Sequence, residues 1–323
     1  MKLHIDPDWL LRMAEKENNR IISVGGLVTR VETNIGVELQ PDMSLAEWSR
    51  LFPLKAMRKY RFSLPQGKSD DEALLNFFDV RSPDAWQTRW SNYSVAFRQT
   101  QKFDFHKEAL TAWVREAEII ANQIPLVEFD EAKLRTSLNV LRRLTREDID
   151  TALDQAQEIC SHCGVALVLI PELPGTRISG CSRWLTDSHA MVGLTPRYKS
   201  GEQLWFTFFH ELGHILLHGH RQLFVVDNAA GEMGDDVVDP VMAKYEEEAD
   251  RFAANILIPP AKLAKLPLHN PDELTNELIQ DFAESIEIHP GIVIGRLQHD
   301  KVLKHWQGNK LKQTLEWGFV PEE

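Results

Sequence analysis

The chain of 323 residues has little cysteine, no long apolar run and no surplus of positive charge. Its three cysteines are too few for a disulfide framework, which predicts a reducing compartment. Cys160 and Cys163 form a C-x-x-C pattern, but without a second pair they are interpreted as small buried residues. The longest apolar stretch, at 165–170, cannot cross a bilayer, and charges within residues 2–8 interrupt any signal sequence. We therefore predict a cytoplasmic protein with no membrane partner.

Acidic residues exceed basic ones, and the formal net charge is −12. General nucleic-acid binding is disfavoured, because phosphate contacts need a surplus of Lys and Arg on one face. The local exception is a basic run within residues 55–61, and a solvated helix face explains it more simply.

The pattern along the chain divides it into three parts. Residues 1–43 contain turn signals and no sustained period, so we expect irregular or strand-like structure there. Residues 44–125 favour a helical domain, in which a helix runs from Ser44 to about Tyr60 after a capping box. Its bulky aromatics are expected to form core rather than a ligand site: Phe77, Phe78, Trp86, Trp90, Phe97 and Trp113.

Residues 126–323 mix helical and strand patterns, which predicts an α+β fold with a small, about three-stranded sheet. Strands are expected at 165–170, 177–184 and 190–194. Helices are expected at 146–160, 202–218, 243–258, 271–285 and 290–299.

The sequence H-E-L-G-H at 210–214 carries the strongest chemical signal. At about 100° per residue, His210, Glu211, His214 and His218 share one helix face with Thr207, and the residues around that face are almost all apolar. A chance H-E-x-x-H on a surface helix would instead lie among solvated side chains. Two imidazoles four residues apart can reach one ion, so His210 and His214 are predicted metal ligands.

A third ligand must come from elsewhere, because catalytic zinc commonly takes three protein ligands and keeps one open position. Glu246 falls within the buried arc of a second helix, whereas Glu247 and Glu248 are predicted to face solvent. Asp250, one turn later, is positioned to accept a ring N–H from a ligating histidine. Two histidines and a carboxylate favour one Zn²⁺ per chain over manganese or iron.

These parts imply a mechanism for hydrolysis. Zinc would lower the pKa of a water molecule, and Glu211 would accept its proton as general base and later protonate the leaving amine. A donor for the developing oxyanion is also expected. The candidates are His218, Tyr198 and Arg183, and His218 is equally well explained as a structural neighbour of a metal ligand.

Several longer motifs resemble the ImmA/IrrE family of zinc metallopeptidases. The principal two are F-F-H-E-L-G-H-I-L-L-H at 208–218 and E-E-E-A-D-R-F-A-A-N-I-L-I-P at 246–259. Shorter ones lie at 77–80, 96–98, 113–118, 179–184, 197–199 and 290–298. The resemblance covers about residues 45–315 and implies a zincin-like metallopeptidase domain. It also implies that His210, His214 and Glu246 are the ligands and Glu211 the base.

The resemblance further implies a substrate class, because such proteins are associated with proteolysis of helix-turn-helix repressors that control stress-response or mobile-element genes. Residues 1–43 are too few and irregular for a helix-turn-helix domain, so we expect no direct DNA binding and a separate repressor or antitoxin as partner. Two alternatives stay open: a metal-containing module that binds such a partner without cleaving it, and a DNA-binding regulator using the helix at 290–298.

Overall fold

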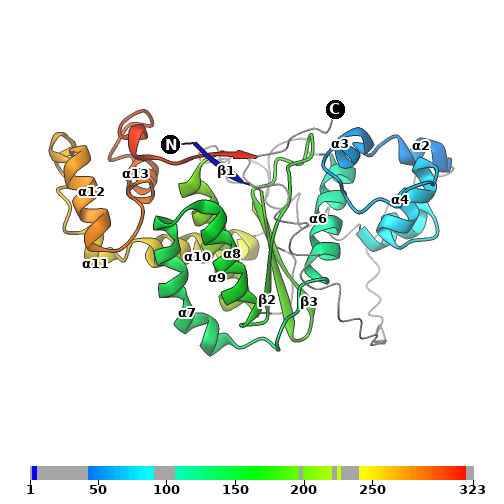
Figure 1. Cartoon of the computed structure of the whole chain (residues 1–323), viewed down its shortest axis with the longest axis horizontal. Helices are drawn as coiled ribbons and strands as arrows, with labels where there is room; N and C mark the ends of the chain where they lie inside the picture. Colours follow the sequence, from blue (N-terminus) through cyan, green and yellow to red (C-terminus); the bar gives the residue numbers. More distant parts are fainter. Residues whose placement is uncertain are drawn as a thin grey trace.

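A computed structural model describes residues 2–5, 43–90, 106–195, 199–219, 224–226 and 240–317. A central sheet stands between two groups of helices (Figure 1). On one side lies α6 (Lys107–Ala121), and on the other lie α7 (Glu131–Arg143), α8 (Ile149–Ser161) and α9 (Gly201–His218). Phe97 and nearly all of the predicted irregular segment at 1–43 lie outside the described residues.

The central sheet has four strands in the order β2-β4-β3-β5. Its strands are β2 (Val165–Leu169), β3 (Gly180–Thr186), β4 (His189–Leu194) and β5 (Phe224–Val226). β2 runs parallel to β4, whereas β3 is antiparallel to both β4 and β5. The three predicted strands are present within a few residues, and β5 adds a short fourth that the sequence did not reveal. The α+β class is confirmed.

Both faces of the sheet are buried, which explains why β2 is a continuous apolar run rather than an alternating one. Val165, Leu167 and Leu169 contribute to a core shared with the helices α8 and α9. Ala166 and Val168, on the opposite face, contribute to a second core shared with α6. The sheet therefore separates the chain into two layers of helices.

The helical layer on the α6 side is built from short helices. They are α2 (Leu45–Ser49), α3 (Leu54–Lys59), α4 (Asp70–Phe78), a helical segment at 83–90 and α6 (Lys107–Ala121). The capping box is present, since Ser44 and Glu47 cap each other at the start of α2. A single helix from Ser44 to Tyr60 was wrong, because Pro53 lacks the N–H that an uninterrupted helix needs. The predicted aromatic core is observed, with Trp48 also packed against Trp86.

On the other side of the sheet, one helix ends before Asp148 and another begins directly after it. They are α7 (Glu131–Arg143) and α8 (Ile149–Ser161). The predicted helix at 146–160 begins later, because the Asp148 side chain caps the N-terminus of α8. α7 was missed, although Leu134, Leu138 and Leu141 have the spacing of one buried helix face.

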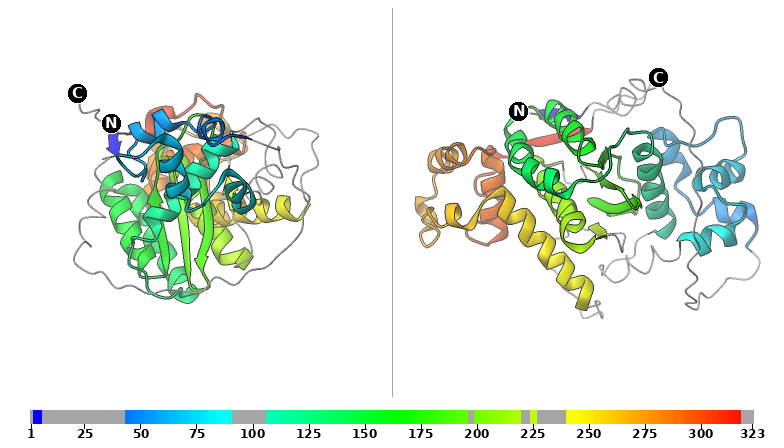
Figure 2. Two further views of the ribbon diagram at one scale, coloured as in Figure 1. Left: turned by 90° about the vertical axis from the view of Figure 1, so that its right-hand side faces the viewer. Right: turned by 90° about the horizontal axis from the view of Figure 1, so that it is seen from below.

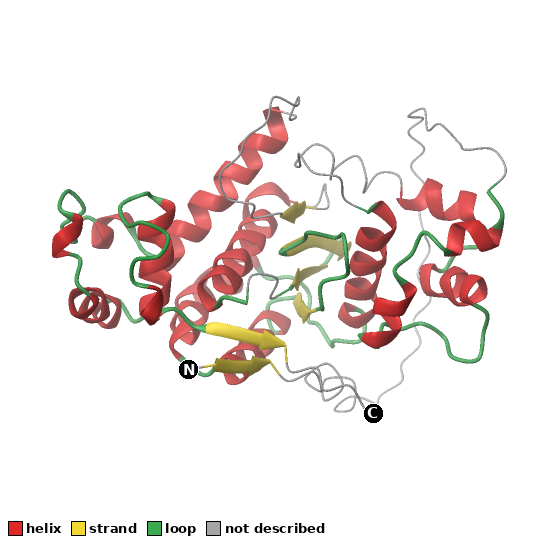
Figure 3. Ribbon diagram, turned by 90° about the horizontal axis from the view of Figure 1, so that it is seen from above, coloured by secondary structure: helices red, strands yellow, loops and turns green. Residues whose placement is uncertain are grey.

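The remaining helices lie on this side of the sheet (Figure 2). They are α9 (Gly201–His218), α10 (Pro240–Leu257), α11 (Pro260–Leu263), α12 (Asn276–Ser285) and α13 (Pro290–His299). Of these, α11, α12 and α13 are grouped at the end of the molecule farthest from α6 (Figure 2). The predicted helix at 271–285 is split into a 3₁₀ turn at Pro271–Glu273 and α12, which Thr275 caps. A second, two-stranded sheet pairs β1 (Lys2–Ile5) with β6 (Thr314–Trp317) in parallel (Figure 3).

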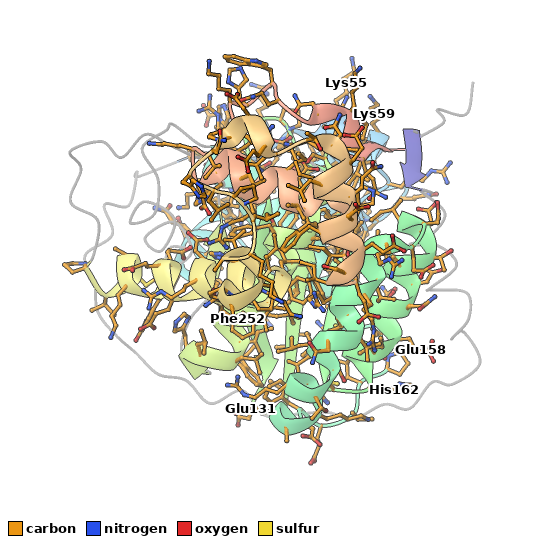
Figure 4. All side chains as sticks on the ribbon, turned by 90° about the vertical axis from the view of Figure 1, so that its left-hand side faces the viewer. Lys55, Lys59, Glu131, Glu158, His162 and Phe252 are labelled. Carbon is orange, nitrogen blue, oxygen red and sulfur yellow. The ribbon has the colours of Figure 1, made fainter. Side chains whose placement is uncertain are left out.

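The basic run of α3 is a solvated helix face, as predicted. Lys55, Arg58 and Lys59 are all exposed, and Figure 4 shows the two labelled lysines at the edge of the molecule. Arg58 pairs with Asp70 at the start of α4, which uses one of these charges within the fold. In the part of the chain that the structure describes, no helix combines the length and apolarity of a membrane span.

Candidate metal centre

The helix α9 is buried on nearly every side. Phe208, Phe209 and Leu212 belong to the core between the sheet and the outer helices, while His210, Glu211 and His214 are each at most 1% exposed. Its last turn is held by Arg135 of α7, whose guanidinium donates to the Leu216 carbonyl at 3.0 Å. The polar groups of α9 are therefore enclosed by protein rather than solvated.

The helices α9 and α10 approach closely where Gly213 lies. A Cβ atom at this position would be 3.3 Å from the Cα of Ala249 and 3.1 Å from Cδ1 of Phe252. Phe252 is labelled on α10 in Figure 4. The glycine between Leu212 and His214 thus permits the contact that brings α10 to the histidines.

His210, His214 and Glu246 converge at this crossing. The two histidine Nε2 atoms are 2.9 Å apart. Glu246 Oε2 lies 3.2 Å from His210 Nε2, and its Oε1 lies 3.5 Å from His214 Nε2. One ligand atom from each residue falls within 4.8 Å of the others. Two imidazoles and a carboxylate from two separate helices therefore share one point.

Each imidazole is also held at its second ring nitrogen. Asp250 Oδ1 lies 2.8 Å from His210 Nδ1. His214 Nδ1 lies 3.0 Å from His218 Nδ1, and His218 Nε2 lies 3.2 Å from Glu248 Oε2. The prediction that Glu248 faces solvent was wrong. At the crossing of the two helices, the Glu248 side chain contacts His218 in the last turn of α9. Only Glu247 behaves as predicted, exposed and paired with Arg251 at 2.5 Å.

Burial disfavours a charge on either imidazole, but their surroundings differ. For His210, the Asp250 and Glu246 carboxylates outweigh burial and raise its pKa to about 10. For His214, burial prevails and lowers the pKa to about 4. Burial would raise the pKa of Glu246, yet the two adjacent imidazoles lower it to about 2. The site therefore attracts positive charge strongly while holding His214 neutral, as a ligand must be.

Glu211 lies beside this cluster and is fully buried. Burial raises its pKa to about 8, against the opposing influence of His210 and Ser182. Neither of its carboxylate oxygens has a hydrogen-bond partner in the described part of the chain. A Cβ atom on Gly180 of β3 would come within 2.9 Å of Glu211 Oε1, so the absence of a side chain there makes room for this carboxylate.

The donor set fits a bound metal ion. Four-coordinate zinc has ligand bonds of about 2.0–2.2 Å, which places ligand atoms about 3.3 Å apart. The observed separations of 2.9, 3.2 and 3.5 Å lie around that value. Within the described residues, Glu246 Oε1 is buried without a hydrogen bond. A cation between the three residues would satisfy it, along with the two nitrogens that face each other.

The other predicted site residues are placed differently. Arg183 pairs with Glu118 of α6, on the opposite face of the sheet from Ser182 and Glu211. It is not brought to the metal-binding cluster. Tyr198 lies outside the described residues. Asp250 and His218 contact the candidate ligands as described above, and their roles stay predictions.

Some residues of the site escaped the sequence analysis. Gly180 and Gly213 provide the close approaches described above, and Glu248 reaches His218. The only signal for Glu248 was its position two residues after Glu246 and two before Asp250. Because such spacing covers a wide arc of a helix, it cannot show which side of α10 meets α9.

Comparison with known proteins agrees with this geometry. The model of the Peptidase_M78 family, described as the IrrE N-terminal-like domain, matches residues 168–289. The matched segment includes the whole of α9 and α10, and therefore His210, Glu211, His214 and Glu246. No curated protein and no solved structure matches the chain. Residues 168–289 are thus similar to the metallopeptidase domain of the Peptidase_M78 family, and they contain a candidate metal site of two histidines and one glutamate.

Proposed function

We propose that the chain is a zinc-dependent endopeptidase. The observation that carries this proposal is the convergence of His210, His214 and Glu246 within 4.8 Å, beside a buried acid that has no partner of its own in the described chain. A site with a purely structural metal has no use for a general base next to an open position. Glu211 is therefore better explained by catalysis than by stability.

The protein residues divide the work of peptide hydrolysis among them. His210, His214 and Glu246 would hold the ion, which would supply the Lewis acidity that activates water and polarises a carbonyl. Glu211 would accept a proton from the attacking water and deliver it to the leaving amine. Burial raises the pKa of Glu211 to about 8 in the metal-free protein, and the charge of a bound ion would lower it, which leaves a carboxylate that can accept the proton.

We propose that the substrate is a separate helix-turn-helix repressor or antitoxin in the cytoplasm. This rests on the resemblance of the metal-site motifs to the ImmA/IrrE family and on the match at residues 168–289. A peptidase acts on a protein, and cleavage of a regulator would release its operon. We further propose that residues 44–125 form a helical domain, packed on the central sheet, that recognises this partner, and that residues 126–323 form the catalytic domain.

Direct DNA binding through α13 is not favoured. A recognition helix must expose the face that enters the major groove. The buried residues of α13 instead face the protein core: Gly291, Ile292, Val293, Ile294 and Leu297. The net charge of −12 also opposes binding to a polyanion.

The test is cleavage of regulators by the purified, zinc-loaded chain. The probes are the repressor or antitoxin proteins encoded beside its own gene, with products identified by mass spectrometry. We expect one defined cut, lost in Glu211→Gln while this variant keeps zinc and still binds the partner. Cleavage by Glu211→Gln at the wild-type rate would exclude the proposed base. Release of the regulator's DNA without any cut, equal in both proteins, would favour the non-proteolytic module.

A further inference from the structure

The two candidate ligand histidines are supported in different ways at Nδ1. His210 meets a carboxylate directly, since Asp250 Oδ1 is 2.8 Å away. His214 meets a second imidazole, because His218 Nδ1 is 3.0 Å from its own Nδ1. This series of hydrogen bonds continues to Glu248, whose Oε2 is 3.2 Å from His218 Nε2. Both supports end on a carboxylate of α10.

The direction of the hydrogen bonds follows from ligand chemistry. A metal-binding Nε2 must offer a lone pair, so the ring proton of neutral His214 resides on Nδ1. His218 Nδ1 must then accept this proton's hydrogen bond, which leaves the proton of His218 on Nε2. That proton is donated to Glu248, a group that can only accept when ionised. One arrangement of protons satisfies all three residues.

We propose that His218 and Glu248 are positioning residues that fix the tautomer and ring orientation of His214 for metal binding. The inference rests on the proposed metal site and extends it, because it assigns a task to two residues that would not touch the ion. Groups that support ligating histidines in this way commonly account for a 10- to 100-fold difference in metal affinity.

The surroundings of His218 hold it in place for this task. Its side chain is 1% exposed, and its ring stacks on Tyr245 with centroids 4.3 Å apart and planes 29° from parallel. Glu248 also has a cation near its other oxygen, since Oε1 lies 3.7 Å from Lys244 Nζ. A buried, stacked ring that is hydrogen-bonded to a carboxylate can orient a neighbour.

The adjacent glutamate provides a matched control. Glu247 shares the helix, the charge and nearly the same distance along the chain, but its side chain is 71% exposed and pairs with Arg251. A general loss of negative charge near the site would affect Glu247→Ala and Glu248→Ala alike. A specific hydrogen-bonded chain would be broken only by the second.

The experiment measures Zn²⁺ affinity of the full-length chain by competition with a chromophoric chelator, and the visible spectrum of the Co²⁺-loaded chain. We expect Glu248→Ala to weaken Zn²⁺ binding by about 10- to 100-fold and to change the Co²⁺ bands. Glu248→Gln keeps an acceptor oxygen and should recover most of the affinity. Glu247→Ala should match the wild type.

A second variant guards against a simple folding defect. His218→Phe retains a ring against Tyr245 and removes both nitrogens, and thermal unfolding of the metal-free proteins shows whether either variant is folded. The variant that combines His218→Phe with Glu248→Ala should bind Zn²⁺ no more weakly than the weaker of the two single variants, because both substitutions break the same series of hydrogen bonds. Additive losses, or wild-type affinity in folded Glu248→Ala, would overturn the inference. Absence of Zn²⁺ binding by the wild type would instead refute the proposed function.

Discussion

Two buried acids, Glu116 and Glu211, lie on helices that cover opposite faces of the central sheet. Burial raises the pKa of Glu116 to about 7 and that of Glu211 to about 8. Glu116 nevertheless accepts hydrogen bonds from the backbone N–H and the hydroxyl of Ser63, at 2.9 and 3.0 Å. Glu211 has no such partner in the described chain. Both glutamates thus have a raised pKa, and what distinguishes them is whether their carboxylate oxygens accept hydrogen bonds.

The neighbours of the two acids repeat this difference. On the α6 side, Glu118 binds Arg115 and Arg183, so opposite charges are paired within the protein. On the α9 side, His210 and His214 turn their Nε2 atoms toward each other, an arrangement that calls for something between them. Polar groups that serve stability are paired in opposite charges, whereas those that would serve a ligand direct their donor atoms at one shared position.

The largest expected effect separates the two acids by activity. Glu211→Gln should lower kcat by about 10²- to 10⁴-fold, because the general base is lost while the shape of the side chain is kept. Glu116→Gln should leave kcat unchanged. Both are measured on the cleaved regulator at saturating zinc. An equal loss in both variants would mean that the acids act through stability alone, and the comparison would fail.

A second prediction concerns the glycines on the two faces of the sheet. In Gly180→Ala the new Cβ would meet Glu211 Oε1 at 2.9 Å and Thr207 Cγ2 at 2.5 Å, which must displace the base. We expect kcat to fall by about 10²-fold, as for a misplacement near 1 Å. In Gly193→Ala the Cβ meets Trp113 at 3.1 Å on the α6 side, so stability should suffer without loss of kcat. The reverse pattern would show that Glu211 is not positioned by β3.

The third prediction uses the pH dependence of stability to test the raised pKa of Glu116. Folded Glu116 keeps its proton up to about pH 7, whereas the unfolded chain releases it near the ordinary pKa of 4.5. Between these values the folded state binds more protons, so the free energy of unfolding falls as pH rises, by about 3 kcal/mol in total. Glu116→Gln should remove this component in urea unfolding, whereas the exposed Glu147→Gln should retain it. A slope unchanged in Glu116→Gln would contradict the assignment.

The smallest effect is expected for Arg183, which tests its predicted part in oxyanion binding. Arg183→Met removes an arginine partner of Glu118 and should cost about 1 kcal/mol of stability. Because the guanidinium lies on the α6 face, kcat should stay at the wild-type value. A loss of about 10²-fold in kcat would instead restore Arg183 as an oxyanion donor.

Much of the site followed from the sequence because helical periodicity is local. The polar face of α9 and the buried arc of α10 are properties of single helices, and they directed His210, His214 and Glu246 inward before any packing was known. The same reasoning recognised the strands of the sheet, whose apolar runs are short and bounded by Gly and Pro.

What could not be predicted depends on how elements meet. The angle at which α10 crosses α9 decides that Glu248 reaches His218, and no pattern within α10 encodes it. The placement of Arg183, in contrast, could have been predicted. Successive residues of a strand point to opposite faces of the sheet, so Arg183 and Ser182 cannot share a face. The short strand β5 has three residues, too few for any period to emerge.

The close contact of α9 with α10 at Gly213 has a mechanical consequence. In the part of the chain that the structure describes, the acids paired with His210, His214 and His218 belong to α10, namely Glu246, Glu248 and Asp250. A bound ion would be ligated by residues of both helices and would hold them together. Loss of the metal and loosening of α10 from α9 would therefore be coupled. Limited digestion of α10 by an added protease would then report how much of the protein holds its metal.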